Sequence, residues 1–173
     1  MVKGALTRLG AAALAIGMMG AGAAYAGPAE QQLLAQYIGS WRGESTLVGS
    51  DKPEPFRCRL SVSQGNQSKI NYTGRCTLVN MNLSVSGTIA FSEANARYEA
   101  VMTSNAGFSG LAVGRKNGNQ IGFDLTERQR DRGGNDVQIG SKIFLVDDTI
   151  IVEFQVEFND SGKVMTASVP FAR

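Results

Sequence analysis

Histidine is absent from this 173-residue sequence. Its imidazole is the base of Ser-His-Asp and Cys-His nucleophile systems, and it is a common ligand of zinc and of heme iron. The absence therefore excludes these catalytic systems and any histidine-ligated metal or heme. We expect no metal site and no cofactor in this protein.

An excess of charge of one sign is also lacking. The sequence has 17 Lys and Arg against 15 Asp and Glu, and two of the basic residues, Lys3 and Arg8, lie in its first ten positions. Without that N-terminal segment the two signs balance. A balanced domain has no strong field to attract nucleic acid or an anionic membrane, so we expect no nucleic-acid partner.

Long apolar runs are confined to residues 1–26, which have the pattern of a secretory signal peptide. A basic start precedes the short apolar stretch from Leu9 to Met19, and Ala24-Tyr25-Ala26 fits the small-x-small rule for cleavage. The apolar stretch is too short and too interrupted by glycine for a membrane span. The sequence predicts cleavage after Ala26, a periplasmic or secreted protein, and a mature chain without a membrane span.

Cysteine occurs only twice, at Cys58 and Cys76. Two thiols in an oxidising compartment normally form a disulfide, and the spacing differs from the Cys-x-x-Cys of redox centres. Apolar and polar residues alternate on both sides of the turn-like segment 64–68, which indicates a hairpin of half-buried strands. Its predicted cross-strand pairs are Cys58 with Cys76, Leu60 with Gly74, and Val62 with Tyr72. We expect a structural disulfide on the apolar face.

The same register places like charges together on the polar face. Arg59 lies opposite Arg75, and Arg57 and Lys69 are nearby. Like charges at opposed positions of a sheet are destabilising. Two interpretations remain open: a neighbouring acid or water shields these side chains, or Arg57, Arg59 and Arg75 form a patch that binds an anion or a protein partner.

Segments with helical periodicity are scarce. One short helix is predicted from Ala29 to Ile38, with Gly39 as its C-terminal stop. About ten strand-like runs follow, joined by short turns such as Asn117-Gly118. The pattern predicts one all-β domain over residues 27–173, an antiparallel up-and-down barrel of about eight to ten strands. A sandwich of immunoglobulin type is the alternative, although its usual cysteine pair is further apart in sequence.

The start of the first strand carries a short motif. Gly39-Ser40-Trp41 directly follows the predicted helix, and this order resembles the lipocalin/avidin superfamily of small barrels. The resemblance implies that Trp41 plugs the closed end of the barrel. It also implies that a late arginine lies over this tryptophan, and Arg42 and Arg173 are the candidates.

Two further groups of proteins share features of this chain. Trp41-Arg42-Gly43, with one cysteine in the second strand and another about eighteen residues later, resembles uncharacterised small exported proteins of alphaproteobacteria, a family that implies no activity. Periplasmic metalloprotease inhibitors are similar as well, because they are small barrels with a Gly-x-Trp opening and one disulfide. That likeness implies inhibition of an exported protease through a free N-terminal segment.

Aromatic residues make up only 8% of the sequence, and most fall at positions expected to point inward. They either fill a solid interior or line an apolar cavity, for which a ten-stranded barrel has room. The candidate ligand-binding residues are Trp41, Phe56, Tyr72, Phe91, Met102 and Phe154. For Trp41, a position in the core is the alternative.

The carboxylates form no recognisable catalytic pair. Glu153 and Glu157 alternate on one face of a strand, and Asp147-Asp148 lies in a turn. Glycosidase chemistry needs two carboxylates that face each other across a cleft, so we expect no enzymatic activity. The sequence favours a non-catalytic periplasmic barrel that binds a small apolar ligand or a cell-envelope partner. Inhibition of an exported protease is the alternative.

Overall fold

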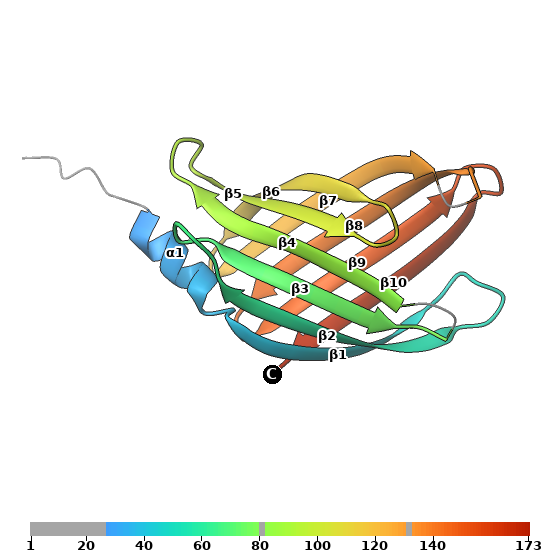
Figure 1. The fold of residues 1–173 in the computed structure, drawn as a ribbon, viewed down its shortest axis with the longest axis horizontal. Coiled ribbons are helices and arrows are strands. Elements are labelled where there is room, and N and C mark those ends of the chain that lie inside the picture. Colours follow the sequence, from blue (N-terminus) through green and yellow to red (C-terminus); the bar gives the residue numbers. More distant parts are fainter. Residues whose placement is uncertain (1–26, 80–81, 131–132) are drawn as a thin grey trace, which may run out of the picture.

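A computed structural model describes residues 27–79, 82–130 and 133–173 of the chain. The predicted signal peptide and its cleavage site lie outside the described residues. Within them, one short helix precedes ten antiparallel strands (Figure 1). The elements are α1 (Gly27–Ala35), β1 (Gly39–Leu47), β2 (Glu54–Gln64), β3 (Ile70–Thr77), β4 (Asn82–Ser92), β5 (Arg97–Ser104), β6 (Ser109–Asn117), β7 (Gln120–Arg130), β8 (Asp136–Val146), β9 (Thr149–Phe158) and β10 (Lys163–Ala172).

The strands form a closed barrel in which each strand pairs with the next along the chain. The first and last strands, β1 and β10, pair with each other and complete the circle. Closure removes the two free edges that an open meander would expose. The predicted all-β, up-and-down barrel with a short N-terminal helix is therefore confirmed.

The seam between β1 and β10 depends on a glycine. Arg42 and Gly43 lie opposite Ala172 and Phe171 in this short pairing. A Cβ atom on Gly43 would lie 2.8 Å from the carbonyl oxygen of Pro170, closer than such atoms approach in folded proteins. The missing side chain at Gly43 therefore lets the two strands come close enough to close the barrel.

The hairpin of β2 and β3 has the predicted register. Cys58 lies opposite Cys76, and the neighbouring inward pairs match the prediction as well. The turn closes with a 2.8 Å hydrogen bond from the Gly65 amide to the Lys69 carbonyl. Gln67 and Ser68 both have positive φ in this turn. Because side chains alternate between faces, a slip by one residue would bury the arginines and expose the cysteines.

Helix α1 is shorter than predicted, since it ends at Ala35 rather than at Ile38. The chain then tightens into a turn that presents the carbonyl of Tyr37 to the indole N–H of Trp41, at 2.9 Å. The amides of Tyr37 and Ile38 donate to carbonyls three residues earlier, at 3.1 and 3.2 Å, so the four-residue spacing of an α-helix is lost before Gly39. Gly39 is consequently the first residue of β1 and not the stop of the helix. The helix lies at one end of the barrel (Figure 1).

Candidate functional site: an apolar cavity inside the barrel

The barrel interior contains a cavity of about 500 Å³. The inward-facing residues of β8, β9 and β10 form one long wall of it, and β2 and β3 contribute the opposite side. Nearly all of these side chains are aliphatic or aromatic. A volume of this size lies within the usual range for small-molecule sites, so the interior is hollow rather than filled.

Small residues on the inner face explain part of the open volume. Gly74 on β3 and Ala167 on β10 line the cavity at positions where larger side chains would project into it. Ala167 lies opposite Phe154 of β9. Ten strands also give a wider barrel than eight, and side chains of ordinary size do not reach across it.

The closed end of the barrel is built around Trp41, of which only 1% is exposed. Its indole N–H is held by the Tyr37 carbonyl, and the two rings stack with centroids 6.3 Å apart. The guanidinium of Arg173 lies over the indole, with Cζ 4.6 Å from the ring centroid, and it also donates to the carbonyl of Gln36. Of the two candidate arginines, Arg173 therefore covers this tryptophan.

A polar contact fastens α1 to the rim of the closed end. Glu30 of the helix accepts hydrogen bonds from the Tyr98 hydroxyl and from the Lys116 ammonium, the latter at 3.1 Å. Burial by itself would raise the pKa of Glu30, but these two hydrogen bonds and the charge of Lys116 outweigh it, so that the pKa lies below its ordinary value of 4.5. The pKa of Tyr98 is raised by burial and by the adjacent carboxylate.

Four of the six ligand-binding candidates line the cavity: Phe56, Tyr72, Met102 and Phe154. Trp41 and Phe91 do not. Trp41 belongs to the plug of the closed end, and Phe91 packs edge-on against Tyr98 with ring centroids 5.1 Å apart. Both point inward, but at a level of the barrel where α1 and neighbouring side chains fill the interior.

The hydroxyl of Tyr72 is directed out of the cavity and into the barrel wall. It donates a hydrogen bond of 3.3 Å to the carbonyl of Val101 on β5, crossing the position of Gly87 on β4. A Cβ atom at Gly87 would lie 2.5 Å from this hydroxyl oxygen. Burial raises the pKa of Tyr72 far above its ordinary value, so the group stays a neutral phenol.

Sequence analysis did not single out Ser141 of β8. It is the sole polar residue in the buried class within the described ranges, with 6% of its surface exposed, and it lines the cavity. The signal was present in the sequence. Val137, Ile139, Ile143 and Leu145 share its face of the strand, so that Ser141 interrupts an otherwise apolar row.

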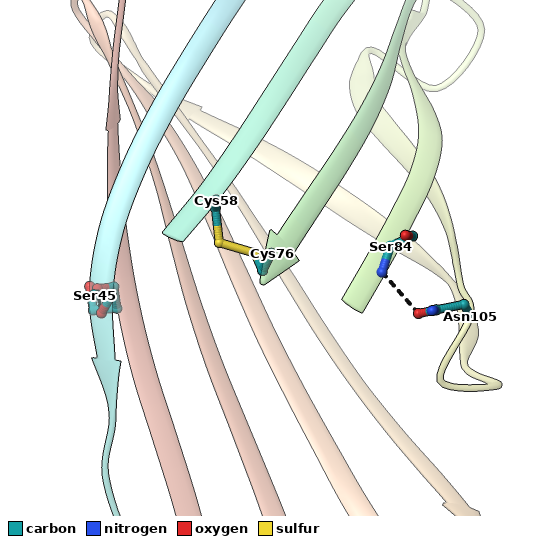
Figure 2. The surroundings of a disulfide bond; sticks show 6 residues. Ser45, Cys58, Cys76, Ser84 and Asn105 are labelled. Carbon is teal, nitrogen blue, oxygen red and sulfur yellow. Dashed lines mark hydrogen bonds between the residues drawn. A yellow bond between two sulfur atoms is a disulfide. The ribbon is translucent and has the colours of Figure 1, made fainter. Parts of the chain in front are cut away.

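The predicted disulfide joins Cys58 and Cys76 across β2 and β3 (Figure 2). Cys76 contributes to the cavity wall, near the end of the barrel opposite to α1. At the same end, Asn105 follows β5 and accepts a 2.9 Å hydrogen bond from the Ser84 amide, which secures the start of β4. Covalent and polar links thus hold the strand ends around the cavity.

The predicted arginine pair is present on the outer wall. Arg59 lies opposite Arg75 on β3 and also opposite Arg42 on β1, which makes a row of three guanidinium groups. Arg57 forms an ion pair with Glu44 at 2.9 Å, whereas the row has no ion pair within the described part of the chain. Of the three arginines of the predicted patch, Arg57, Arg59 and Arg75, an acid is therefore paired with Arg57 alone. Binding of an anion or a protein partner by this face stays a prediction.

Residues 27–79, 82–130 and 133–173 hold no group of three or more Cys, Asp or Glu side chains arranged to bind a metal ion. Over these residues, no helix has the length and apolar character needed to cross a bilayer.

Comparison with known proteins gives a family and a fold. Residues 30–169 match the family model described as the THAP4-like, heme-binding β-barrel domain. The structure of Rv2717c from M. tuberculosis is similar with a TM-score of 0.61 and 15% identity, covering 82% of this chain and 95% of that one. The S-type phycobiliprotein lyase CPES from Guillardia theta is similar with a TM-score of 0.54 and 11% identity, covering 82% and 90%.

At such low identity the two structures show a shared fold and nothing finer. No curated protein matches the sequence significantly. The family model, in contrast, spans most of the chain, from within α1 to within β10. The chain therefore belongs to the family of THAP4-like, heme-binding β-barrel domains.

Proposed function

We propose that this protein is an exported, non-catalytic barrel that binds one small apolar molecule in its interior. The observation that carries the proposal is the interior cavity of about 500 Å³ with an almost wholly apolar wall. Transfer of apolar surface from water into such a wall is favourable by roughly 25 cal/mol per Å². The family description, which names heme binding, agrees with small-molecule binding in this fold.

Heme, which the family name implies, does not fit the donors of this cavity. Heme iron is held by histidine, by a cysteine thiolate, by a tyrosine phenolate, or by methionine together with histidine. The sequence has no histidine, and both cysteines are consumed by the disulfide. Met102 and Met165 line the cavity, but they lack the histidine that completes such a ligand pair.

The tyrosines of the cavity wall are equally unsuited to an iron. Tyr72 is engaged with the Val101 carbonyl, and its raised pKa opposes formation of a phenolate. The pKa of Tyr37 is also raised, by burial and by the carboxylates of Asp147 and Asp148. The apolar wall, rather than a metal bond, must therefore supply the affinity for a ligand.

Export and the absence of catalysis are supported separately, the first by the sequence and the second by the cavity lining. The signal-like segment 1–26 supports export to the periplasm, where a disulfide is stable. The absence of any carboxylate from the cavity lining described above supports a binding role rather than catalysis. Protease inhibition receives no support, because α1 packs on the barrel through Glu30 instead of leaving an extended N-terminal segment free.

The test is binding of N-phenyl-1-naphthylamine (NPN), an apolar dye that becomes fluorescent out of water, to the purified mature protein. We expect saturable binding to one site. Ala167→Phe should weaken it at least about tenfold, because the new ring occupies the cavity beside Phe154. Ala167→Leu, a smaller change that is easier to accommodate, should weaken it less.

The matched control is Thr73→Leu, which adds apolar volume on the exposed outer face of β3. It should leave NPN binding unchanged. Circular dichroism of each variant verifies that the barrel is folded. Non-saturable binding to the wild type, or equal affinity of all folded variants, would contradict the proposed site.

A further inference from the structure

Ser141 occupies the middle of the cavity wall. It is the sixth of eleven residues in β8 (Asp136–Val146), so that it lies halfway between the plugged end and the opposite end of the barrel. Its neighbours across the sheet are Leu125 of β7 and Phe154 of β9. The adjacent residues along the strand, Gly140 and Lys142, belong to the outer face. The serine side chain therefore faces an apolar interior.

The hydroxyl of Ser141 has no protein partner in the described part of the chain. The backbone of Ser141 is used in the ladders to β7 and β9, and no hydrogen bond involves its Oγ atom. No described side-chain polar atom is sealed within protein without a partner, so this oxygen must border open volume. Ser141 also borders a second, more polar hollow of about 500 Å³, whose other lining residues lie mostly on the outer face of the sheet. Because strand alternation points the Ser141 side chain inward, its hydroxyl borders the interior cavity.

A hydroxyl that faces an apolar cavity without a protein partner is unusual, because only the contents of the cavity can hydrogen-bond to it. Most buried polar atoms are hydrogen-bonded, and leaving one unpaired costs about 1–3 kcal/mol. The small size of serine could serve only to make room for Phe154, but alanine would do so without this penalty. A hydrogen-bonding group of the bound molecule would remove the penalty.

We propose that the Ser141 hydroxyl is the polar contact that orients the ligand, and that the ligand is an apolar ring or chain system bearing one neutral hydroxyl or carbonyl group. This inference rests on the proposed function. The group that meets Ser141 is neutral because the side chains opposed to Ser141, Leu125 and Phe154, are apolar, and an unpaired buried charge is strongly unfavourable. The charged residues of the cavity lining, Arg59, Arg75 and Arg130, belong to β2, β3 and the last position of β7. Ser141 thus determines which apolar molecules are preferred rather than whether any are bound.

The experiment compares 2-naphthol with naphthalene, which share a ring system and differ by one hydroxyl. The affinity of NPN is first measured for the wild type and for Ser141→Ala. Displacement of NPN by 2-naphthol and by naphthalene then gives the affinity of each compound for each protein, and the ratio of the 2-naphthol affinity to the naphthalene affinity is compared between the two proteins. We expect the preference for 2-naphthol to fall about 3- to 10-fold in Ser141→Ala, the value of one neutral hydrogen bond. Naphthalene affinity should be unchanged or slightly higher.

Ser61→Ala is the matched control, because Ser61 is an exposed serine on the outer face of β2. Its ratio should equal that of the wild type. An equal ratio in Ser141→Ala, or failure of 2-naphthol to displace NPN from the wild type, overturns the role of Ser141 while leaving the cavity function intact. Absence of saturable NPN binding to the wild type would instead overturn the cavity function, and this inference with it.

Discussion

The guanidinium of Arg173 and the indole ring of Trp41 lie 4.6 Å apart, although 132 positions separate them in the sequence. This contact joins the beginning of β1 to the residue that follows β10, on the same side as the seam that closes the barrel. Trp41 in turn holds the turn after α1 through the Tyr37 carbonyl. The two residues therefore couple closure of the sheet to the seating of the helix.

Arg173→Met should destabilise the protein by about 1 kcal/mol, because it removes a cation–π contact and a hydrogen bond to the Gln36 carbonyl. The sequence has one tryptophan, so the fluorescence of Trp41 during urea denaturation reports this end of the barrel directly. Arg115→Met, at an exposed position on β6, is the control and should change the midpoint little. Equal midpoints for the two variants would contradict the role of Arg173.

Gly43→Ala should destabilise the protein by about 1–3 kcal/mol, the usual effect of overpacking at a close contact. Its new Cβ would lie 2.7 Å from Val169 and 2.8 Å from the Pro170 oxygen, in the closing seam. Gly140→Ala is a matched control in another strand, because its Cβ would meet only Gln155 at an ordinary 3.8 Å. Thermal unfolding followed by circular dichroism measures both, and a Gly43 variant no less stable than the Gly140 variant would refute the seam argument.

Replacing both Cys58 and Cys76 by alanine should lower the free energy of unfolding by about 3 kcal/mol, since the link closes a short loop in the unfolded chain. Urea denaturation of the variant and of the oxidised wild type gives the difference. The register of β2 and β3 should survive, because it is set by the alternation of inward and outward residues. Full thiol labelling of the wild type purified without reductant would show that the bond does not form.

Glu30 should contribute stability that depends on pH. Its pKa is depressed in the folded state, so the contribution is fully present above about 4.5 and is lost as pH falls through the folded pKa. Glu30→Gln should therefore cost about 1 kcal/mol at pH 7, and the difference from the wild type should shrink toward pH 3. Urea midpoints at both pH values provide the measurement.

Glu44→Gln is the comparison for this pH dependence, since the ion pair of Glu44 with Arg57 is almost fully exposed. Exposed pairs contribute little, so this variant should resemble the wild type throughout. If the urea midpoint of Glu30→Gln fell between pH 7 and pH 3 by as much as that of the wild type, the Glu30 carboxylate would not be fastening α1 to the barrel.

Local alternation of side chains was enough to identify the strands, the hairpin register and the disulfide. These features depend on residues close together in sequence, and a register error is penalised at every position of the strand. The early helix was placed less well. Its last turn is decided by the contact between Tyr37 and Trp41, which packing at the barrel end creates.

By itself, the sequence determined an all-β chain, the face of each strand that turns inward, and the exclusion of histidine chemistry. Only the tertiary structure decided that the interior is hollow, that Arg173 rather than Arg42 covers Trp41, and that the Ser141 hydroxyl has no protein partner within the described residues. The physical reason is that these properties depend on how ten strands curve around a shared volume. That volume is set by closure of the whole sheet and not by any one segment.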